Sequence, residues 1–233
     1  MRVAIMQPYF LPYIGYWQLI ADADAFVIYD NIKYTKHSWI NRNRFLLNGE
    51  PRVFSLPLRH GPDEADVIER EIAGNYLPQD LMRRFEGAYK KAPHYAETME
   101  VIVRVLWCKD VNLFGYIRNS VEEIAGHLGI TTPIIRSSAI EIDHMNLKSQ
   151  DKVLAICKAL NATEYVNASG GVELYDRIKF QEQGIRLDFI RSKALRYQQF
   201  GETFVPWLSI VDVLMFNPIE QVREIIQNNK EIF

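Results

Sequence analysis

Residues 29–44, YDNIKYTKHSWINRNR, form the densest polar and aromatic stretch of the chain. Lysine and arginine neutralise phosphate groups, and asparagine donates to or accepts from a sugar or an amide. This composition indicates a site for an anionic ligand. A solvated β-hairpin with ordinary surface charges is the alternative interpretation. The candidate binding residues in this stretch are Asn31, Lys33, Lys36, Trp39, Asn41, Arg42, Asn43 and Arg44.

The same stretch contains two candidates for a proton acceptor. His37 suits that role because histidine has an ordinary pKa of about 6.5. An exposed histidine without a catalytic role is the alternative. Asp30 is the second candidate, and its alternative role is to end the preceding strand.

A second candidate segment, residues 5–17, reads IMQPYFLPYIGYW and follows a short apolar run. Aromatic and proline side chains at the end of a strand predict a wall shaped for a planar or sugar ring, with tyrosines as neutral hydrogen-bond donors. Core packing is the alternative, and we favour it for Phe10 and Trp17. The candidate binding residues here are Gln7, Tyr9, Tyr13, Gly15 and Tyr16.

The third candidate segment is NASGG, residues 167–171, between an expected strand and an expected helix. Adjacent glycines allow the backbone to approach a phosphate or an oxyanion closely, although a plain turn also uses glycine. The first candidates for a catalytic serine are Ser169, Ser137 and Ser138. No G-x-S-x-G pattern, which marks the nucleophile of many serine hydrolases, supports any of them. The candidate residues of the segment are Asn167, Ser169, Gly170 and Gly171.

Apolar runs and turn signals predict the elements that position these segments. We expect strands at 2–6, 25–29, 164–167 and 185–190, a hairpin around Asn48-Gly49, and helices between them. Ser149 is expected to cap one helix and Gly129 to end another. Alternating strands and helices predict an α/β protein with a largely parallel, Rossmann-like sheet. Residues 1–75 and 129–233 form the expected core domain, and residues 76–128 a mainly helical insertion.

Ligands of parallel sheets bind at the carboxyl ends of the strands, where helix N-termini offer free amides. We therefore expect the first two segments and the glycine pair near residue 170 to converge into one cleft for an anionic small molecule.

Composition excludes several classes of function. A net charge of −2 gives no electrostatic basis for nonspecific nucleic-acid binding. The apolar runs are too short for a membrane helix, and the N-terminus lacks a secretory pattern, so we expect a cytoplasmic, soluble protein. No metal site is expected from the histidine spacing, and Cys108 and Cys157 are expected to be buried, reduced thiols. An oligomer is possible.

The first 40 residues resemble, at the level of the fold, nucleotidylyltransferase-like enzymes such as the pantothenate synthetases. Tyr13-Ile14-Gly15-Tyr16 has the frame of their HxGH signature, with tyrosine replacing both histidines. Because tyrosine is neutral at pH 7, this replacement argues against the usual adenylylation chemistry. Their basic KMSKS-like partner is absent as well.

A second resemblance extends from residue 3 to about residue 217. In chain order, QPYFLPYIGYWQLI, YDNIKYTKHSWINRNR, LGITTPIIRSS, YVNASGGVELYD and FVPWLSIVDVLMFN resemble the WbqC-like protein family. Members tend to be encoded with genes for O-antigen and other surface-polysaccharide sugars. The resemblance implies a step that decorates an amino sugar.

Together these observations predict a transferase that attaches an acyl or aminoacyl group to the amine of a nucleotide-linked amino sugar. Basic residues of the first segment would bind the diphosphate, and Tyr9, Tyr13 and Trp39 would stack on base or sugar. One alternative is an adenylate-forming amide ligase that uses ATP and Mg²⁺ as cofactors. The other is a noncatalytic assembly protein of a glycan-synthesis complex.

Overall fold

The computed structural model describes residues 1–233 and contains a six-stranded, mostly parallel sheet. Its strands lie in the order β5-β2-β1-β6-β7-β8, and only the last pair, β7 and β8, is antiparallel. The strands are β1 (Arg2–Met6), β2 (Ala25–Ile28), β5 (Ile134–Arg136), β6 (Glu164–Ala168), β7 (Arg186–Ser192) and β8 (Lys230–Ile232). The α/β class and the largely parallel sheet predicted from the sequence are confirmed.

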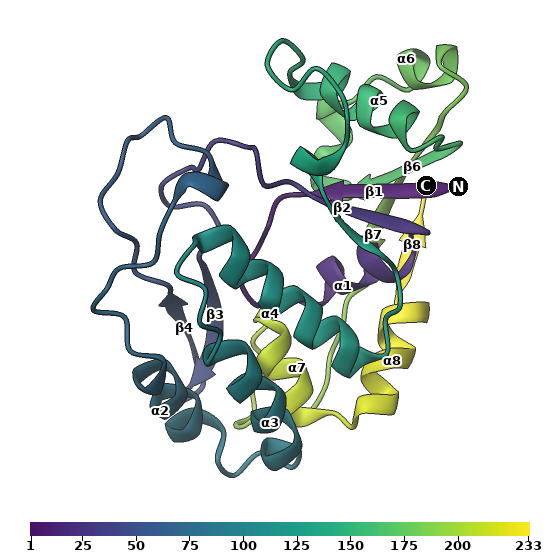
Figure 1. Cartoon of the computed structure of the whole chain (residues 1–233). Coiled ribbons are helices and arrows are strands. Elements are labelled where there is room, and N and C mark those ends of the chain that lie inside the picture. The colour runs from purple at the N-terminus through teal and green to yellow at the C-terminus, as the bar shows by residue number, and fades with distance from the viewer.

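Helices cover both faces of the sheet (Figure 1). Side chains alternate along β1, so that Ala4 joins the larger hydrophobic core while Val3 and Ile5 join the smaller one. The larger core contains residues of α1 (Ile14–Ala21), α4 (Leu113–Leu128), α7 (Ile210–Phe216) and α8 (Ile219–Asn228). The smaller core contains residues of α5 (Ser149–Ala159) and α6 (Arg177–Glu182).

Chain order reverses between β1 and β6, at the centre of the sheet. The five parallel strands, numbered along the chain, lie in the order 3-2-1-4-5, which is the Rossmann order. In open α/β sheets, ligands bind in the crevice beside the carboxyl ends at such a reversal. The loops after β1, β2 and β6 therefore share the functional edge of the sheet.

The middle of the chain adds a hairpin and three helices. The hairpin joins β3 (Arg42–Leu47) to β4 (Glu50–Ser55), and Asn48 and Gly49 in its turn both have positive φ, +54° and +76°. The helices are α2 (Pro78–Tyr89), α3 (Tyr95–Leu106) and α4. Phe45 of the hairpin packs against Phe85 and Tyr89 of α2, and all three belong to the larger core. The helical character of residues 76–128 is confirmed, whereas their status as a separate insertion stays a prediction.

Three local details differ from the sequence-based expectations. Lys148, and not Ser149, occupies the N-cap of α5, without a side-chain capping bond. Residues 169–174 form a 3-10 helix before the short α6. The edge strand β8 carried no sequence signal, because it has three residues. Gly129 does end α4 in the left-handed conformation, with φ +72°. None of the helices combines the length and the apolar character that crossing a bilayer requires.

Candidate ligand-binding site

The loop between β1 and α1 is fixed by hydrogen bonds from distant parts of the chain. The carbonyl of Leu11, a residue with φ +45°, accepts from Ser209 Oγ (2.7 Å) and from Asn43 Nδ2 (2.9 Å). The Tyr16 hydroxyl donates to the Gln7 carbonyl (3.0 Å). A non-glycine residue in the left-handed region is retained only where its surroundings enforce it. The loop is thus a rigid wall at the functional edge.

This wall borders a pocket of about 200 Å³, here named the aromatic cleft. The loop after β1, the segment leading into β3 and the segment before α7 all contribute. Trp39 and Trp207 are 43% and 61% exposed, so two large side chains are partly open to solvent here. The lining residues are Tyr9, Pro12, Tyr13, Trp39, Asn43, Arg44 and Trp207. Five of the residues proposed from the sequence as ligand contacts thus lie together.

Arg44 joins the two tryptophans of the cleft. Its guanidinium carbon lies 5.5 Å from the centre of the Trp39 ring, and Arg42 stacks on the same ring at 5.3 Å. The Arg44 NH2 group donates to the Trp207 carbonyl (3.0 Å), and Trp207 has φ +60°. The buried Nε of Arg44 has no hydrogen-bond partner. The Nε has almost no exposed surface, so an anion in the cleft would contact the guanidinium through its outer NH groups, of which NH2 is exposed.

A second pocket, of about 280 Å³, lies on the other side of Tyr13 and Trp207 and is here named the apolar pocket. The rings of Tyr13 and Trp207 are 5.9 Å apart and line both pockets. The end of β7, the start of α1 and the irregular segment 193–208 form the walls. The lining residues are Tyr13, Ile14, Ser192, Lys193, Ala194, Leu195, Arg196, Tyr197, Phe204, Pro206, Trp207, Leu208 and Val213.

Asp30 lies at the carboxyl end of β2 but lines neither pocket. Its carboxylate is fully buried and accepts from Ser137 Oγ (2.7 Å), from the Ser138 amide (2.8 Å) and from Ser138 Oγ. Arg136 Nε lies 3.4 Å from it. The contacts join the ends of β2 and β5. This arrangement favours the alternative role of Asp30, which is to end strand β2. The hydroxyl groups of Ser137 and Ser138 are hydrogen-bonded in the same cluster.

The neighbouring cluster contains a lysine that the sequence did not single out. Lys152 of α5 is buried; its Nζ donates to the Asn31 carbonyl (3.3 Å) and lies 5.3 Å from the centre of the Tyr29 ring. Burial lowers the pKa of Lys152, while the nearby Asp66 and Asp30 carboxylates oppose this shift. The Asn31 amide contacts His144 Nδ1 (2.9 Å). A single lysine in an amphipathic helix gives no signal that could have identified it.

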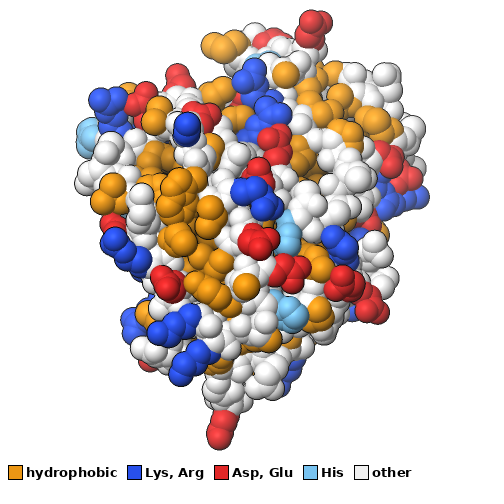
Figure 2. Space-filling view, turned by 60° about the horizontal axis from the view of Figure 1, so that its bottom comes forward, with side chains coloured by type: hydrophobic (Ala, Val, Ile, Leu, Met, Phe, Trp, Pro, Cys, Tyr) orange, Lys and Arg blue, Asp and Glu red, His pale blue; other side chains and the backbone are white.

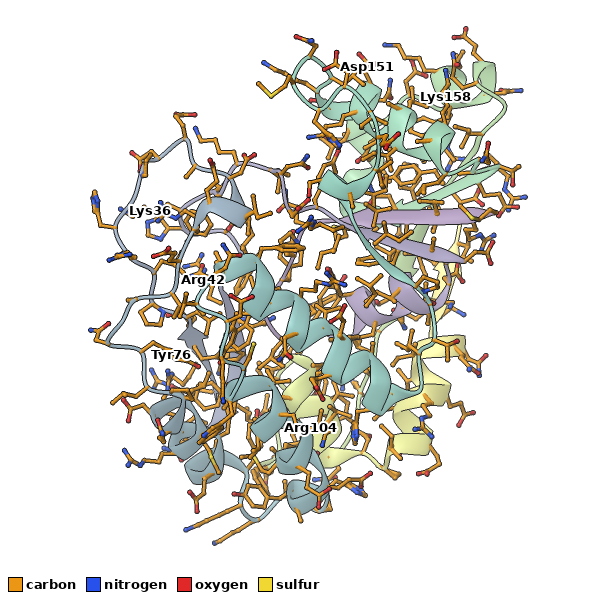
Figure 3. The ribbon with its side chains drawn as sticks, in the orientation of Figure 1. Lys36, Arg42, Tyr76, Arg104, Asp151 and Lys158 are labelled. Carbon is orange, nitrogen blue, oxygen red and sulfur yellow. The ribbon has the colours of Figure 1, made fainter.

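The remaining candidates of the first segment lie outside both pockets. Lys36 and His37 are exposed on the loop before β3, and Figure 3 places Lys36 on that loop and Arg42 at the start of β3. Lys33 forms an exposed ion pair with Glu64 (2.7 Å). Asn41 is occupied within the fold, because its amide donates to the Leu56 carbonyl (2.8 Å) and its oxygen accepts from Tyr34 (3.0 Å).

Residues 167–171 line neither of the two pockets. The Asn167 amide donates to Tyr165 (2.9 Å), on the side of the smaller core, and its oxygen accepts from the Ala168 amide (2.7 Å). Gly171 is buried, and a Cβ there would lie 3.1 Å from Asn167 Nδ2, so local packing accounts for this glycine. The space around Gly170 is open. The two pockets therefore combine the first two predicted segments without the third.

Only the first tyrosine of the YIGY frame faces a pocket. Tyr16 is buried, and burial raises the pKa of its phenol well above the ordinary value. Tyr13 lines both pockets, and its ring lies over the first turn of α1. A Cβ at Gly15 would come within 2.4 Å of the Tyr13 hydroxyl oxygen. Glycine at this position thus makes room for the Tyr13 ring rather than for a ligand.

The two cysteines differ from each other, because Cys157 is buried as expected whereas Cys108 is only partly buried. No three His, Cys, Asp or Glu side chains are grouped so that they could hold a metal ion. Cys157 is buried in the smaller core, and burial raises the pKa of its thiol to about 12. A thiolate nucleophile is therefore not available at Cys157 near neutral pH.

Acidic and basic side chains are interspersed on the surface that faces the viewer in Figure 2, and hydrophobic side chains gather in a patch left of its centre. This mixture matches the near balance of 27 basic and 29 acidic residues in the chain. This face carries no broad surface of a single charge.

Comparison with known proteins places the chain in a family. Residues 7–224 match the model of the WbqC-like protein family. The chain is also 31% identical over 219 residues to the uncharacterized protein Rv1507c of Mycobacterium tuberculosis (strain ATCC 25618 / H37Rv), with 93% of each chain covered. No solved structure matches it. Because the match includes both the loop after β1 and the segment before α7, the chain belongs to the WbqC-like protein family.

Proposed function

We propose that this protein is a transferase of surface-polysaccharide sugar biosynthesis, which attaches an acyl or aminoacyl group to the amine of a nucleotide-linked amino sugar. The reaction class rests on the kind of gene neighbourhood that the family resemblance implies. The binding mode rests on the aromatic cleft.

The observation that carries the proposal is Arg44 between two exposed tryptophans, with its guanidinium next to the Trp39 ring and its NH2 group on the Trp207 carbonyl. Trp39 and Trp207 offer flat faces for a base and a sugar ring, and Tyr9 and Tyr13 close the cleft. A guanidinium suits the diphosphate between base and sugar, because its planar fork matches phosphate oxygens. Arg42, stacked on the same Trp39 ring, adds a second cation.

In the proposed reaction, the sugar amine attacks the carbonyl carbon of an activated acyl donor. A C–N bond forms, the bond from carbon to the donor's carrier breaks, and the carrier leaves with the electron pair. The nitrogen loses one proton, which passes to the carrier. His37, the proton acceptor predicted from the sequence, lies outside both pockets, so its role stays a prediction. His37 is exposed, has φ +69°, and its carbonyl accepts from Arg42, which links it to the Trp39 side of the cleft.

A turnover assay with matched tryptophan variants tests the proposal. UDP- and dTDP-linked amino sugars are incubated with acyl-coenzyme A donors, and N-acylated product is measured by mass spectrometry. Trp39→Ala is expected to lower kcat/KM about tenfold, because base stacking contributes about 1–3 kcal/mol per ring. Trp107→Ala is the control, since Trp107 is also 43% exposed but lies at the end of α3.

The same assay separates the proposal from its alternatives. Product that forms only with ATP, Mg²⁺ and a free acid would identify an amide ligase. Absence of product from the wild type with every donor and acceptor would favour a noncatalytic assembly role.

Gly15→Ala is expected to weaken binding of a UDP-linked amino sugar about tenfold without unfolding the protein. The added methyl group would displace the Tyr13 ring, while alanine in a helix favours folding by about 0.5–1 kcal/mol over glycine. Calorimetric titration and thermal unfolding measure both effects. Gly87→Ala is the control, because a Cβ at Gly87 in α2 meets nothing within 4 Å. Unchanged affinity in Gly15→Ala would show that the Tyr13 wall does not contact the sugar nucleotide.

A further inference from the structure

The apolar pocket is not used by the sugar nucleotide in the proposed function. Nine of its thirteen lining residues are hydrophobic, so it suits an apolar group rather than a sugar. Its volume of about 280 Å³ lies just below the usual range for small-molecule sites, which begins at about 300 Å³. A short aliphatic chain or a single aromatic ring is the size of group that it fits.

The irregular segment 193–208 that forms one wall is held in place by a buried carboxylate. Asp212 of α7 is fully buried and accepts from the Tyr197 hydroxyl and from the Gln199 amide, both at 2.6 Å. The Gln199 side chain also accepts from the Val205 amide (2.8 Å) and donates to the Val205 carbonyl (3.1 Å). The wall is therefore formed before any ligand arrives, as most small-molecule sites are.

Two cations border this pocket without carboxylate partners. Lys193 and Arg196 are exposed lining residues, and neither takes part in any ion pair of the protein. Most other exposed arginines here, such as Arg52 and Arg186, are paired with a carboxylate. An apolar interior with two free cations at its border is complementary to an apolar group carried on an anion.

The apolar pocket and the aromatic cleft share one wall, which consists of Tyr13 and Trp207. Ligands in the two pockets would therefore both contact this pair of rings. Trp207 has φ +60°, a conformation that a non-glycine residue keeps only where its surroundings enforce it, so the position of this ring is fixed by the fold.

We propose that the apolar pocket binds the acyl group of the donor substrate, activated on a phosphate-bearing carrier whose phosphates contact Lys193 and Arg196. This inference rests on the proposed function, because it assigns the pocket by its position beside the sugar-nucleotide cleft. Two sources share this chemistry: a coenzyme A thioester, and an acyl adenylate made from ATP.

The test is calorimetric titration of the full-length protein with hexanoyl-coenzyme A and coenzyme A, with hexanoyl-sulfamoyl adenosine and sulfamoyl adenosine, and with a UDP-linked amino sugar. Ala194→Phe fills the pocket from an exposed lining position, and Ala96→Phe, at an exposed position on α3, is its control. The double variant Lys193→Ala/Arg196→Ala removes the cations, and Lys179→Ala on α6 is the control for charge.

The expected result is that one acylated probe binds at least tenfold more tightly than its carrier without the acyl group. Ala194→Phe is expected to abolish this gain, and Ala96→Phe to preserve it. The double cation variant is expected to weaken the acylated probe at least tenfold, with Lys179→Ala unchanged. Whichever of hexanoyl-coenzyme A and hexanoyl-sulfamoyl adenosine binds identifies the source of the acyl group.

An acyl group that adds no affinity, or an Ala194→Phe variant that binds like the wild type, would overturn the inference. If Ala194→Phe does not fold, the double variant Lys193→Ala/Arg196→Ala replaces it as the test. Binding of the acylated probe to this variant as tightly as to the wild type would overturn the inference. In one outcome, no acylated probe binds, but Ala194→Phe still binds the UDP-linked sugar. This outcome overturns the inference and leaves the proposed function standing. In the reverse outcome, an acylated probe binds but the UDP-linked sugar does not. This outcome supports the apolar pocket as the acyl site and overturns the assignment of the aromatic cleft to a sugar nucleotide.

Discussion

Replacing Arg44 by alanine is expected to weaken the binding of a UDP-linked amino sugar about 30- to 150-fold. Charge-assisted hydrogen bonds contribute about 1.5–3 kcal/mol, and each 1.4 kcal/mol is about a factor of ten in affinity. The loss would be at the upper end because Arg44 also holds the Trp207 carbonyl (3.0 Å) and stacks on Trp39. Calorimetric titration at fixed salt concentration measures it.

Arg44→Lys separates charge from geometry. Lysine keeps the positive charge but lacks the planar fork that contacts Trp39 and Trp207 together, so we expect it to recover only a small part of the affinity. Arg52→Ala on the neighbouring strand β4 is the control, since Arg52 is exposed and paired with Glu50 (2.8 Å). Wild-type affinity in Arg44→Ala would remove the main support for a diphosphate in the aromatic cleft.

Asp212→Ala is expected to reduce the free energy of unfolding by about 3–5 kcal/mol, because each buried donor left without a partner costs about 1–3 kcal/mol. The fully buried carboxylate accepts from Tyr89 (2.9 Å), Tyr197 (2.6 Å) and Gln199 (2.6 Å). It thereby joins α2, α7 and the segment 193–208. Burial raises the pKa of Asp212, which shows that burying its charged form is unfavourable. Removing the carboxylate removes this cost and offsets part of the lost stability.

Urea unfolding followed by circular dichroism measures this change. Asp212→Asn keeps the shape and one acceptor oxygen, so we expect a smaller loss than for alanine. Asp63→Ala is the surface control, expected to change stability by less than about 0.5 kcal/mol, because Asp63 is exposed and forms no ion pair. A loss of less than about 1 kcal/mol in Asp212→Ala would mean that its three donors find other partners.

The elements that follow local rules were predictable from the sequence. The strand at residues 2–6 is a continuous apolar run, and its buried residues are predicted by that run alone. The hairpin at Asn48-Gly49 and the helix end at Gly129 follow from the positive φ that each turn needs. The parallel sheet then followed from the alternation of these strands with helices.

Most of the aromatic cleft was predictable from the sequence, but Trp207 was not. Tyr9, Tyr13 and Arg44 belong to polar-aromatic stretches that stand out in the sequence. Trp207 lies in an irregular segment without periodicity, and it reaches Arg44 across 163 positions of the chain. Only tertiary packing brings these two residues together, so no local pattern could have paired them.

The sequence also could not show which polar side chains form hydrogen bonds within the fold and which remain available to a ligand. Asn41 and Arg44 look alike as members of one polar stretch, yet the nitrogen and the oxygen of the Asn41 side chain each have a partner within the fold, while Arg44 Nε has none. Their difference depends on partners such as Leu56 and Trp207, which come from other elements.

A crystal structure of the protein with a bound UDP-linked amino sugar tests most directly whether the aromatic cleft is the substrate site. We expect the sugar nucleotide to lie between Trp39 and Trp207, with its diphosphate within hydrogen-bond distance of Arg44 and its amine directed towards Tyr13. A sugar nucleotide bound at residues 167–171 instead, with both tryptophans free, would contradict the proposed site.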